Sequence, residues 1–200
     1  MTLTKNDISQ IANQVGLDYA RLMAFISVES GGAGFNTDGK IIIQFEPTWF
    51  SKYLTQFKIA HTFNRTTDAK GNRQYVIQVG DKTIQNGVQG QPSEWIAFNT
   101  AFAIHPKAAM LSTSIGLMQI MGFNYASAGF PSVDAMWDSF KKGEYQQVLG
   151  GATFIKNNTA LYNALRNKDW AHVAFYYNGA NYAENNYDHK LAAAYAKYSV

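Results

Sequence analysis

Two glutamates, Glu29 and Glu46, directly follow apolar runs, a setting in which a carboxyl group can act as a chemical acid or base. Leu22, Phe25 and Ile26 share one stripe of a helix with about 3.6 residues per turn, and Glu29 is the next position on it. A carboxylate there loses hydration and meets the negative end of the helix dipole, so its protonated form is favoured. Such a group can serve as a general acid. The segment alone leaves open that the Glu29 side chain turns to solvent from a frayed last turn.

The second carboxyl group ends a predicted strand. Residues 41–45 are short and β-branched, and Glu46 follows them before Pro47. Two carboxyl groups in one cleft are the usual equipment for glycoside hydrolysis, one giving a proton and the other handling water or the sugar cation. The remaining glutamates have helix-start or loop explanations; they are Glu94, Glu144 and Glu184.

The residue inventory excludes several other chemistries. The chain has no cysteine, so disulfides, thiolate metal sites and thiol nucleophiles are impossible. The histidines have no metal-ligand spacing and are expected at surfaces or helix caps; they are His61, His105, His172 and His189. There is no nucleophile-elbow or phosphate-binding glycine motif, and the basic residues are scattered. We therefore expect no metal, no cofactor and no nucleic-acid partner.

Length and composition indicate one globular domain. The chain has 200 residues, of which 46% are hydrophobic and 14% aromatic, enough for a sizeable core. The net charge of +3 suits an anionic polymer such as bacterial envelope material. The polar start lacks the apolar centre of a signal peptide, and no stretch approaches the ~20 apolar residues of a membrane span. We expect synthesis in the cytoplasm and no stable membrane insertion.

The elements that must position these residues are mostly helical, so the expected fold class is mainly α (α+β). Helices are predicted over residues 6–14, 18–29, 93–103, 115–120, 133–141, 144–157, 169–176 and 185–198, with another opening at Pro106. Ser93 and Asp18 are the expected caps of two of them. The stretch 57–91 is polar, and within it residues 74–79 and 82–84 predict a β-hairpin.

Three segments in fixed order carry a family resemblance: Glu29–Gly32, Ser112–Gly122 and Ala174–Tyr182. They resemble the signature segments of the lysozyme-like superfamily. More narrowly, the chain is similar to the phage-type N-acetylmuramidases, catalytic domains of endolysins from phages of Gram-negative bacteria. The similarity extends to Phe45–Glu46, Lys107–Ala109 and Tyr182–Ala192, and covers most of the chain outside residues 57–91.

The resemblance implies a lysozyme-like helical fold with a substrate groove, and cleavage of the β-1,4 bond from N-acetylmuramic acid to N-acetylglucosamine. It assigns Glu29 as the general acid and makes Glu46 the candidate second carboxylate. It places substrate-binding residues on two facing segments: Ser114 and Gln119 on one, and Tyr177, Asn178 and Tyr182 on the other. Aromatic faces suit sugar rings, and amides can bind N-acetyl groups. Helix packing with a buried polar tip is the alternative for Gln119, Tyr177 and Tyr182.

The sequence departs from the family pattern in four places. Ile115 stands where Trp is expected before the glycine, and His105 stands where Asp is usual. After Glu46, residues 47–50 replace a segment that usually carries a basic or imidazole side chain, which weakens the assignment of Glu46. Residues 57–91 are more elaborate than a simple loop, and either widen contact with cross-linked glycan or cover core surface.

We therefore expect residues 1–200 to form a single catalytic domain without a separate cell-wall-binding domain, acting as a monomer on peptidoglycan glycan strands. Release to the cell wall through a holin-type membrane lesion is the expected route. Two alternatives remain. A lytic transglycosylase would need one acid/base alone and would leave 1,6-anhydro-muramic ends. A non-catalytic peptidoglycan-binding component of a virion or toxin would bind glycan without turnover.

Overall fold

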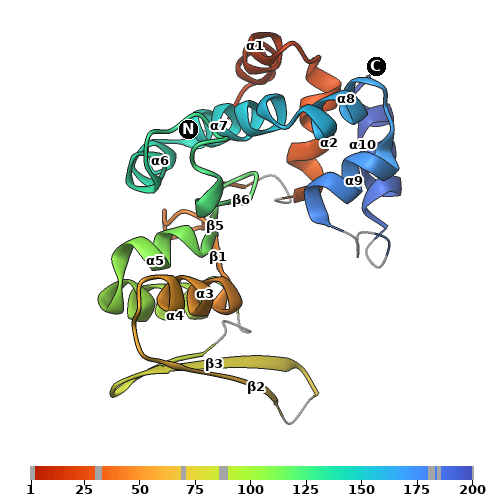
Figure 1. Cartoon of the computed structure of the whole chain (residues 1–200). Coiled ribbons are helices and arrows are strands. Elements are labelled where there is room, and N and C mark those ends of the chain that lie inside the picture. Colours follow the sequence, from red (N-terminus) through yellow and green to blue (C-terminus); the bar gives the residue numbers. More distant parts are fainter. Residues whose placement is uncertain are drawn as a thin grey trace.

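The computed structural model describes residues 3–29, 33–68, 71–85, 90–179, 183 and 186–199, and only the backbone of Glu29 and Asn178. Its helices are α1 (Lys5–Val15), α2 (Tyr19–Glu29), α3 (Pro47–Gln56), α4 (Gln91–Ile104), α5 (Pro106–Leu111), the 3-10 turn η1 (Gly122–Asn124), α6 (Val133–Phe140), α7 (Glu144–Asn157), α8 (Thr159–Arg166), α9 (Trp170–Asn178) and α10 (Tyr187–Tyr198). Its strands are β1 (Ile43–Phe45), β2 (Thr62–Thr67), β3 (Arg73–Val79), β4 (Lys82–Gln85), β5 (Thr113–Ile115) and β6 (Ile120–Met121). The mainly α, α+β fold class is confirmed (Figure 1).

The first two helices show how local sequence sets their ends. The Thr4 hydroxyl accepts the Asp7 N–H at 3.2 Å, and the Asp7 carboxylate accepts the Thr4 N–H at 2.9 Å, a reciprocal capping box. Gly16, at φ 75°, ends α1 in the left-handed conformation. Asp18 then accepts the Arg21 N–H at 2.8 Å, as expected for the residue that precedes α2.

The predicted helix over residues 115–120 is wrong. Those residues form the end of β5, a tight turn over residues 116–119, and the start of β6. Ile115 pairs with Ile43 on one side and with Ile120 on the other, so strand pairing overrides the local helical pattern. Gly116 at φ 74° and Gln119 at φ 47° lie in the left-handed region, which a right-handed helix cannot contain.

Other elements were absent from the sequence expectation or began elsewhere. Helix α3 starts at Pro47, whose missing N–H costs nothing at the first helical position. Helix α8 follows Asn158, whose side chain accepts the Leu161 N–H at 3.1 Å. Ser93 is not the cap of α4, because that helix already begins at Gln91 after Gly90. This earlier start brings Gln91 onto the helix.

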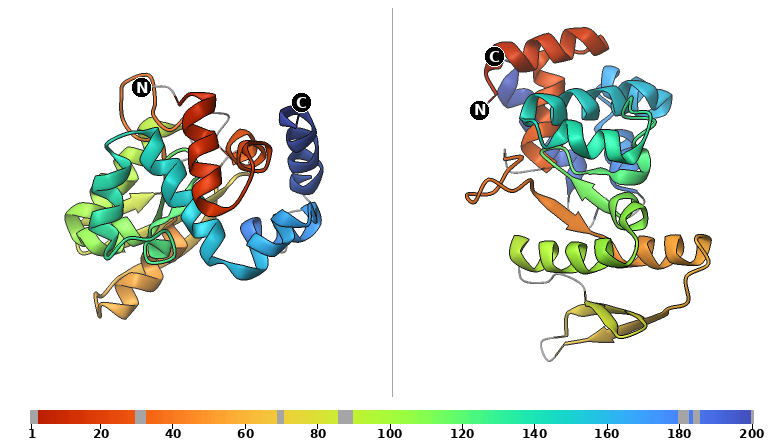
Figure 2. Two further views of the ribbon diagram at one scale, coloured as in Figure 1. Left: turned by 90° about the horizontal axis from the view of Figure 1, so that it is seen from above. Right: turned by 90° about the vertical axis from the view of Figure 1, so that its left-hand side faces the viewer.

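The two antiparallel sheets lie on opposite sides of α3 and α4 (Figures 1 and 2). The first has the strand order β1-β5-β6, and the second has the order β2-β3-β4. The second contains the predicted hairpin, β3 and β4, and adds β2, which pairs with β3 over six residues. Ile77 and Ile84 are buried and belong to the same core as Leu54 of α3. The sheet formed within residues 57–91 therefore covers core surface.

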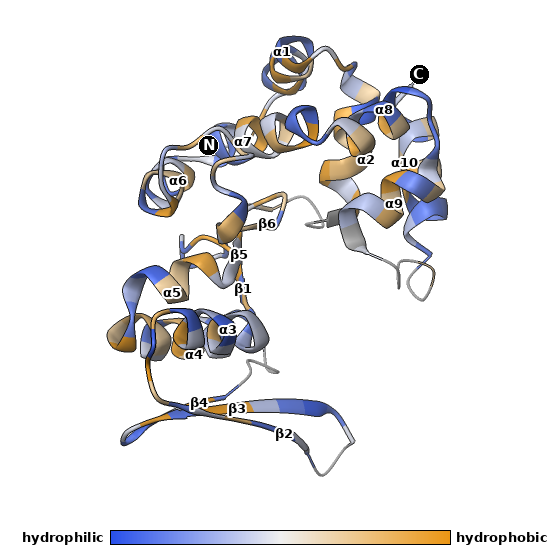
Figure 3. Cartoon of the chain, viewed as in Figure 1, coloured by the Kyte–Doolittle hydropathy of each residue, from blue (hydrophilic) through white to orange (hydrophobic). Residues whose placement is uncertain are grey.

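A single cluster of buried hydrophobic residues connects the helices and both sheets, from Ile11 of α1 to Ile84 of β4. In Figure 3, hydrophobic (orange) and hydrophilic (blue) residues alternate along the helices, as expected for helices with one buried face. Helix α10 packs beside α2 and α9, with Leu191 buried. Within the described residues, none of the helices combines the length and apolar character needed to cross a bilayer.

Candidate active site

The first candidate, Glu29, is the last residue of α2. The stripe that precedes it is buried as expected: Leu22, Phe25 and Ile26 all belong to the core. The side chain of Glu29 lies outside the described residues, as do residues 30–32, where the sequence predicts the helix to be capped. The backbone thus brings Glu29 to the end of a helix with a buried face, and its role as general acid stays a prediction.

The second candidate, Glu46, lies between β1 and α3. It is the N-cap residue of α3 by backbone conformation, with φ −108° and ψ 94°, but its side chain makes no capping hydrogen bond. Instead its carboxylate accepts the Gln44 side-chain N–H at 2.9 Å. Burial raises the pKa of Glu46, and the hydrogen bond from Gln44 opposes that rise. The Glu46 carboxyl group is thus not used to cap α3.

Ser114 and Gln119 are brought together at the turn between β5 and β6. The Ser114 hydroxyl donates to the Gln119 side-chain oxygen at 2.9 Å, and the Gln119 amide donates to the Gly116 carbonyl at 2.8 Å. Ser114 is also the register partner of Gln44, whose side chain binds Glu46. The hydrogen bond from the Gln119 amide to Gly116 therefore closes the turn. Because β1 pairs with β5, the turn is joined to Glu46 through Ser114 and Gln44.

Gln147 of α7, which the sequence did not indicate as a site residue, stabilises the same turn by hydrogen bonding. Its side chain is fully buried, accepts the Leu117 N–H at 2.8 Å and donates to the Phe140 carbonyl at 3.0 Å. A Cβ at Gly116 would lie 2.7 Å from the Gln147 side chain, so only glycine fits there. A glutamine near the start of a helix gives no sequence signal that its side chain will bind a distant turn.

Tyr177 joins α9 to this turn. Its hydroxyl donates to the Met118 carbonyl at 2.7 Å, and its ring packs edge-on against Phe25 of α2 at 4.9 Å between centroids. The Tyr177 hydroxyl is thus bonded within the protein, as in the packing alternative, and its partner Met118 directly precedes Gln119. The side chain of Asn178 and all of Tyr182 lie outside the described residues.

Glu94 is the functional candidate that the sequence reasoning missed. It lies in the first turn of α4, as its helix-start explanation requires, but it is also buried, with 8% of its surface exposed. Its carboxylate accepts the Phe45 N–H at 2.8 Å, one residue before Glu46. Burial raises the pKa of Glu94, the Phe45 hydrogen bond opposes this, and the negative charge of Glu46 adds to the rise. The structure thus brings together a pair of carboxyl groups, Glu46 and Glu94.

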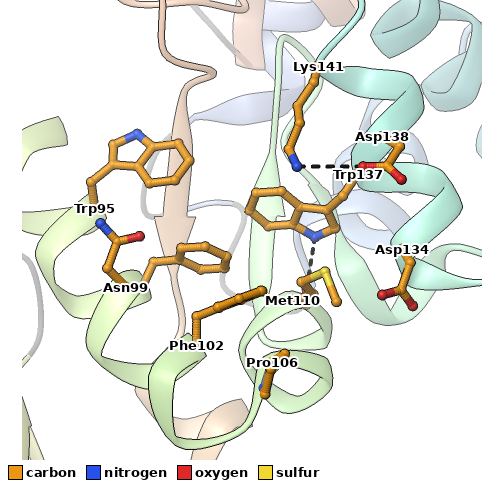
Figure 4. Close-up of a pocket in the computed structure, with 10 residues that line it drawn as sticks. Trp95, Asn99, Phe102, Pro106, Met110, Asp134, Trp137, Asp138 and Lys141 are labelled. Atoms are coloured by element: carbon orange, nitrogen blue, oxygen red, sulfur yellow. Dashed lines mark hydrogen bonds and ion pairs between the residues drawn. The ribbon is translucent and has the colours of Figure 1, made fainter.

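His105 and a pocket between α4, α5 and α6 are separate from the candidate site residues. His105 caps α5 by accepting the Ala108 N–H at 3.1 Å, as expected for a capping histidine. The described residues contain no cluster of three potential metal ligands. A pocket of about 310 Å³ opens between α4, α5 and α6, with Trp95 and Trp137 on opposite walls (Figure 4). None of the predicted catalytic or substrate-binding residues lines it.

Comparison with known proteins identifies the family. The chain matches the family model for N-acetylmuramidase over residues 18–199. The comparison with curated proteins gives no match. Among solved structures, it is similar to the endolysin of Burkholderia phage AP3, with 33% identity and a TM-score of 0.81 over 99% of this chain and 71% of that chain. Because the family match extends over nearly the whole chain, the chain belongs to the N-acetylmuramidase family and is a glycoside hydrolase that acts on peptidoglycan.

Proposed function

We propose that the chain is an endolysin that cleaves the β-1,4 bond between N-acetylmuramic acid and N-acetylglucosamine, with Glu29 as general acid. The observation that carries this proposal is the family match over residues 18–199, which includes both candidate carboxyl groups. The similarity to a phage endolysin supports the biological setting. The position of Glu29 at the end of a helix with a buried apolar stripe supports its chemical role.

In the proposed reaction, Glu29 protonates the glycosidic oxygen as the bond to the sugar breaks. Water then captures the oxocarbenium-like centre, with Glu46 as the carboxylate that positions and deprotonates it. A carboxylate with a raised pKa is a stronger base than an ordinary one, which suits Glu46 to this step. Its freedom from capping α3 supports the same assignment.

Substrate contacts are proposed at the turn between β5 and β6 and at the end of α9. Ser114 and Gln119 are already hydrogen-bonded to each other, which supports a role in holding the turn in shape against the glycan. Tyr177 and Asn178 belong to the end of α9, and together with Tyr182 they form the aromatic and amide segment that is proposed to contact the glycan. The half-buried Tyr177 keeps part of its surface accessible, which supports a contact with a sugar.

The decisive experiment is mass spectrometry of the soluble fragments released from purified Gram-negative peptidoglycan. Muramic acid at a free reducing end is the expected product of hydrolysis at the proposed bond. Fragments that end in 1,6-anhydro-muramic acid would replace the proposal with transglycosylase chemistry. N-acetylglucosamine at the reducing end would overturn the bond assignment, and the lack of any fragment would favour a binding protein.

The role of Glu29 is tested by Glu29→Gln. Because general acid catalysis contributes about 10²–10⁴ in rate, the variant should lose at least that factor of lytic activity while its circular dichroism spectrum stays native. Asp18→Asn is the matched control at the other end of α2, since it also removes one negative charge next to the helix. Near-normal lysis by Glu29→Gln would contradict the assignment of Glu29 as the general acid.

We also propose that the enzyme reaches peptidoglycan through a holin-type membrane lesion. Gram-negative cells that produce the protein alone should keep their optical density, and should lyse once a pore-forming holin is co-produced. Lysis by the protein alone would contradict this route and would indicate a delivery signal of its own.

A further inference from the structure

The outer edge of β1 is held by side chains of α4. β1 is an edge strand of the β1-β5-β6 sheet, so one row of its backbone groups faces away from β5. Gln91 binds Ile43 twice, accepting its N–H at 2.9 Å and donating to its carbonyl at 2.7 Å. The Trp95 indole donates to the carbonyl of residue 41 at 3.2 Å, and Glu94 accepts the Phe45 N–H at 2.8 Å.

The spacing of these three residues explains why one helix can do this. Positions 91, 94 and 95 are separated by three and four residues, so they share one face of α4. Their side chains bind alternate residues, position 41 just before β1 and positions 43 and 45 within it, as the groups of a neighbouring strand would. We call this set of Gln91, Glu94 and Trp95 the α4 clamp.

The last hydrogen bond of the α4 clamp is made to Phe45, the residue that directly precedes Glu46. Glu94 holds the N–H of Phe45, and on the other side the N–H of Glu46 donates to the Ser112 carbonyl at 2.9 Å. The backbone that carries the Glu46 carboxyl group is therefore fixed from both edges. A displacement of about 1 Å at a reacting group can cost about 10²-fold in rate. In the proposed reaction, the hydrogen bonds to Phe45 and Glu46 therefore help to keep the Glu46 carboxyl group in its reactive position.

The charge of Glu46 raises the pKa of Glu94, and because an electrostatic interaction is reciprocal, an ionised Glu94 also disfavours ionisation of Glu46. The side chain that is hydrogen-bonded to Glu46 is that of Gln44 on β1, which is neutral. β5 contributes the neutral Ser114, opposite Gln44, and the Glu29 side chain on α2 lies outside the described residues. Two carboxyl groups in a buried setting disfavour each other's ionisation.

We propose that Glu94 is a positioning residue: together with Gln91 it fixes the end of β1 that carries Glu46, and its charge acts on the Glu46 carboxyl group. The proposal rests on the proposed function, in which Glu46 is the second carboxylate. Glu94 itself touches neither sugar nor water in the reaction, and it acts through the Phe45 N–H and through its charge.

Three variants separate the hydrogen bond from the charge. Glu94→Gln keeps an oxygen that can accept the Phe45 N–H but removes the charge, so the acidic limb of the kcat/KM profile should move to lower pH. Glu94→Leu removes both, and should also lower kcat by about 10–10² at the optimum. Gln91→Met loosens the strand without changing any charge, so kcat should fall while the acidic limb stays in place.

A direct titration keeps this test independent of catalysis. Carboxyl-carbon NMR follows Glu46 in the intact protein, and its midpoint should be lower in Glu94→Gln than in the wild type, with thermal melts confirming that each variant is folded. Equal midpoints, or wild-type kcat in Glu94→Leu, would overturn the proposal. If the midpoint falls but Glu46→Gln lyses normally, the coupling stands and the proposed function of Glu46 fails.

Discussion

At the scale of single residues, the site contains carboxyl groups whose burial opposes their ionisation. Burial raises the pKa of both Glu46 and Glu94, and the negative charge of Glu46 adds to the rise at Glu94. Such an arrangement costs stability at neutral pH and supplies a base of raised strength. A purely structural reason for placing two glutamates there is hard to find, since amides would make the same hydrogen bonds without the charge.

Glu46→Gln should reduce hydrolysis by about 10²–10⁴, because an amide cannot deprotonate water. The measurement is the rate of soluble muropeptide release from purified peptidoglycan near neutral pH. Gln44→Met is a useful comparison, since it removes the hydrogen bond to Glu46 and leaves the carboxylate, and should cost less. A nearly silent Glu46→Gln would favour a transglycosylase with one acid/base.

Glu46→Gln should also be more stable than the wild type at neutral pH. A raised pKa means that the folded protein binds the Glu46 proton more readily than the unfolded chain does. Between the unfolded and folded pKa values, stability therefore falls as pH rises, and the loss is complete above the folded pKa. Glu46→Gln removes that loss, so its Tm should exceed that of the wild type at about pH 7 and match it below about pH 4. A lower Tm at both pH values would contradict the sign.

At the scale of elements, the turn between β5 and β6 depends on a helix distant in sequence. Gln147 of α7 binds the turn at Leu117 and α6 at Phe140, and Tyr177 of α9 binds it at Met118. The turn also contains two residues in the left-handed conformation, Gly116 and Gln119. Its shape therefore reflects packing from the two helices α7 and α9 as well as its own sequence.

Gly116→Ala should destabilise the fold by about 2–4 kcal/mol, from the left-handed φ and the clash with Gln147 together. Gly39→Ala is the matched control, because Gly39 has φ 77° and nothing within 4 Å of an added Cβ. That control should cost about 1–2 kcal/mol. Urea unfolding of both variants gives the comparison, and equal losses would show that Gln147 yields without cost.

At the scale of the whole molecule, one buried cluster includes the residues of both sheets and of the helices between them. The second sheet lies on the other side of α3 and α4 from the first sheet (Figure 1), yet Ile77 and Ile84 belong to that cluster. We therefore expect the described parts to unfold together, in one cooperative transition.

Ile77→Ala should lower the free energy of unfolding by about 2–5 kcal/mol and keep the unfolding a single transition. Val76→Ala on the opposite face of β3 is only half-buried and should cost less. Differential scanning calorimetry tests both variants, with kcat measured well below the Tm expected to stay near wild type. A separate early transition in Ile77→Ala would show that the second sheet is an independent unit.

The sequence by itself determined the family, the fold class and the places of Glu29 and Glu46 at the ends of α2 and β1, because these depend on local patterns. The stripe that ends at Glu29, the strand before Glu46 and the ordered signature segments are all short-range signals. The hairpin, the cap at Asp18 and the capping role of His105 follow from turn and cap chemistry in the same way.

Only the tertiary structure decided what surrounds those groups. Residues 115–120 form strands and a turn because Ile115 pairs with Ile43, a partner more than 70 positions away. Glu94 serves as more than a helix-start residue because α4 begins at Gln91 and lies against the free edge of β1. The physical reason is common to both: a free strand edge must find hydrogen-bond partners, and which segment supplies them depends on how distant elements pack.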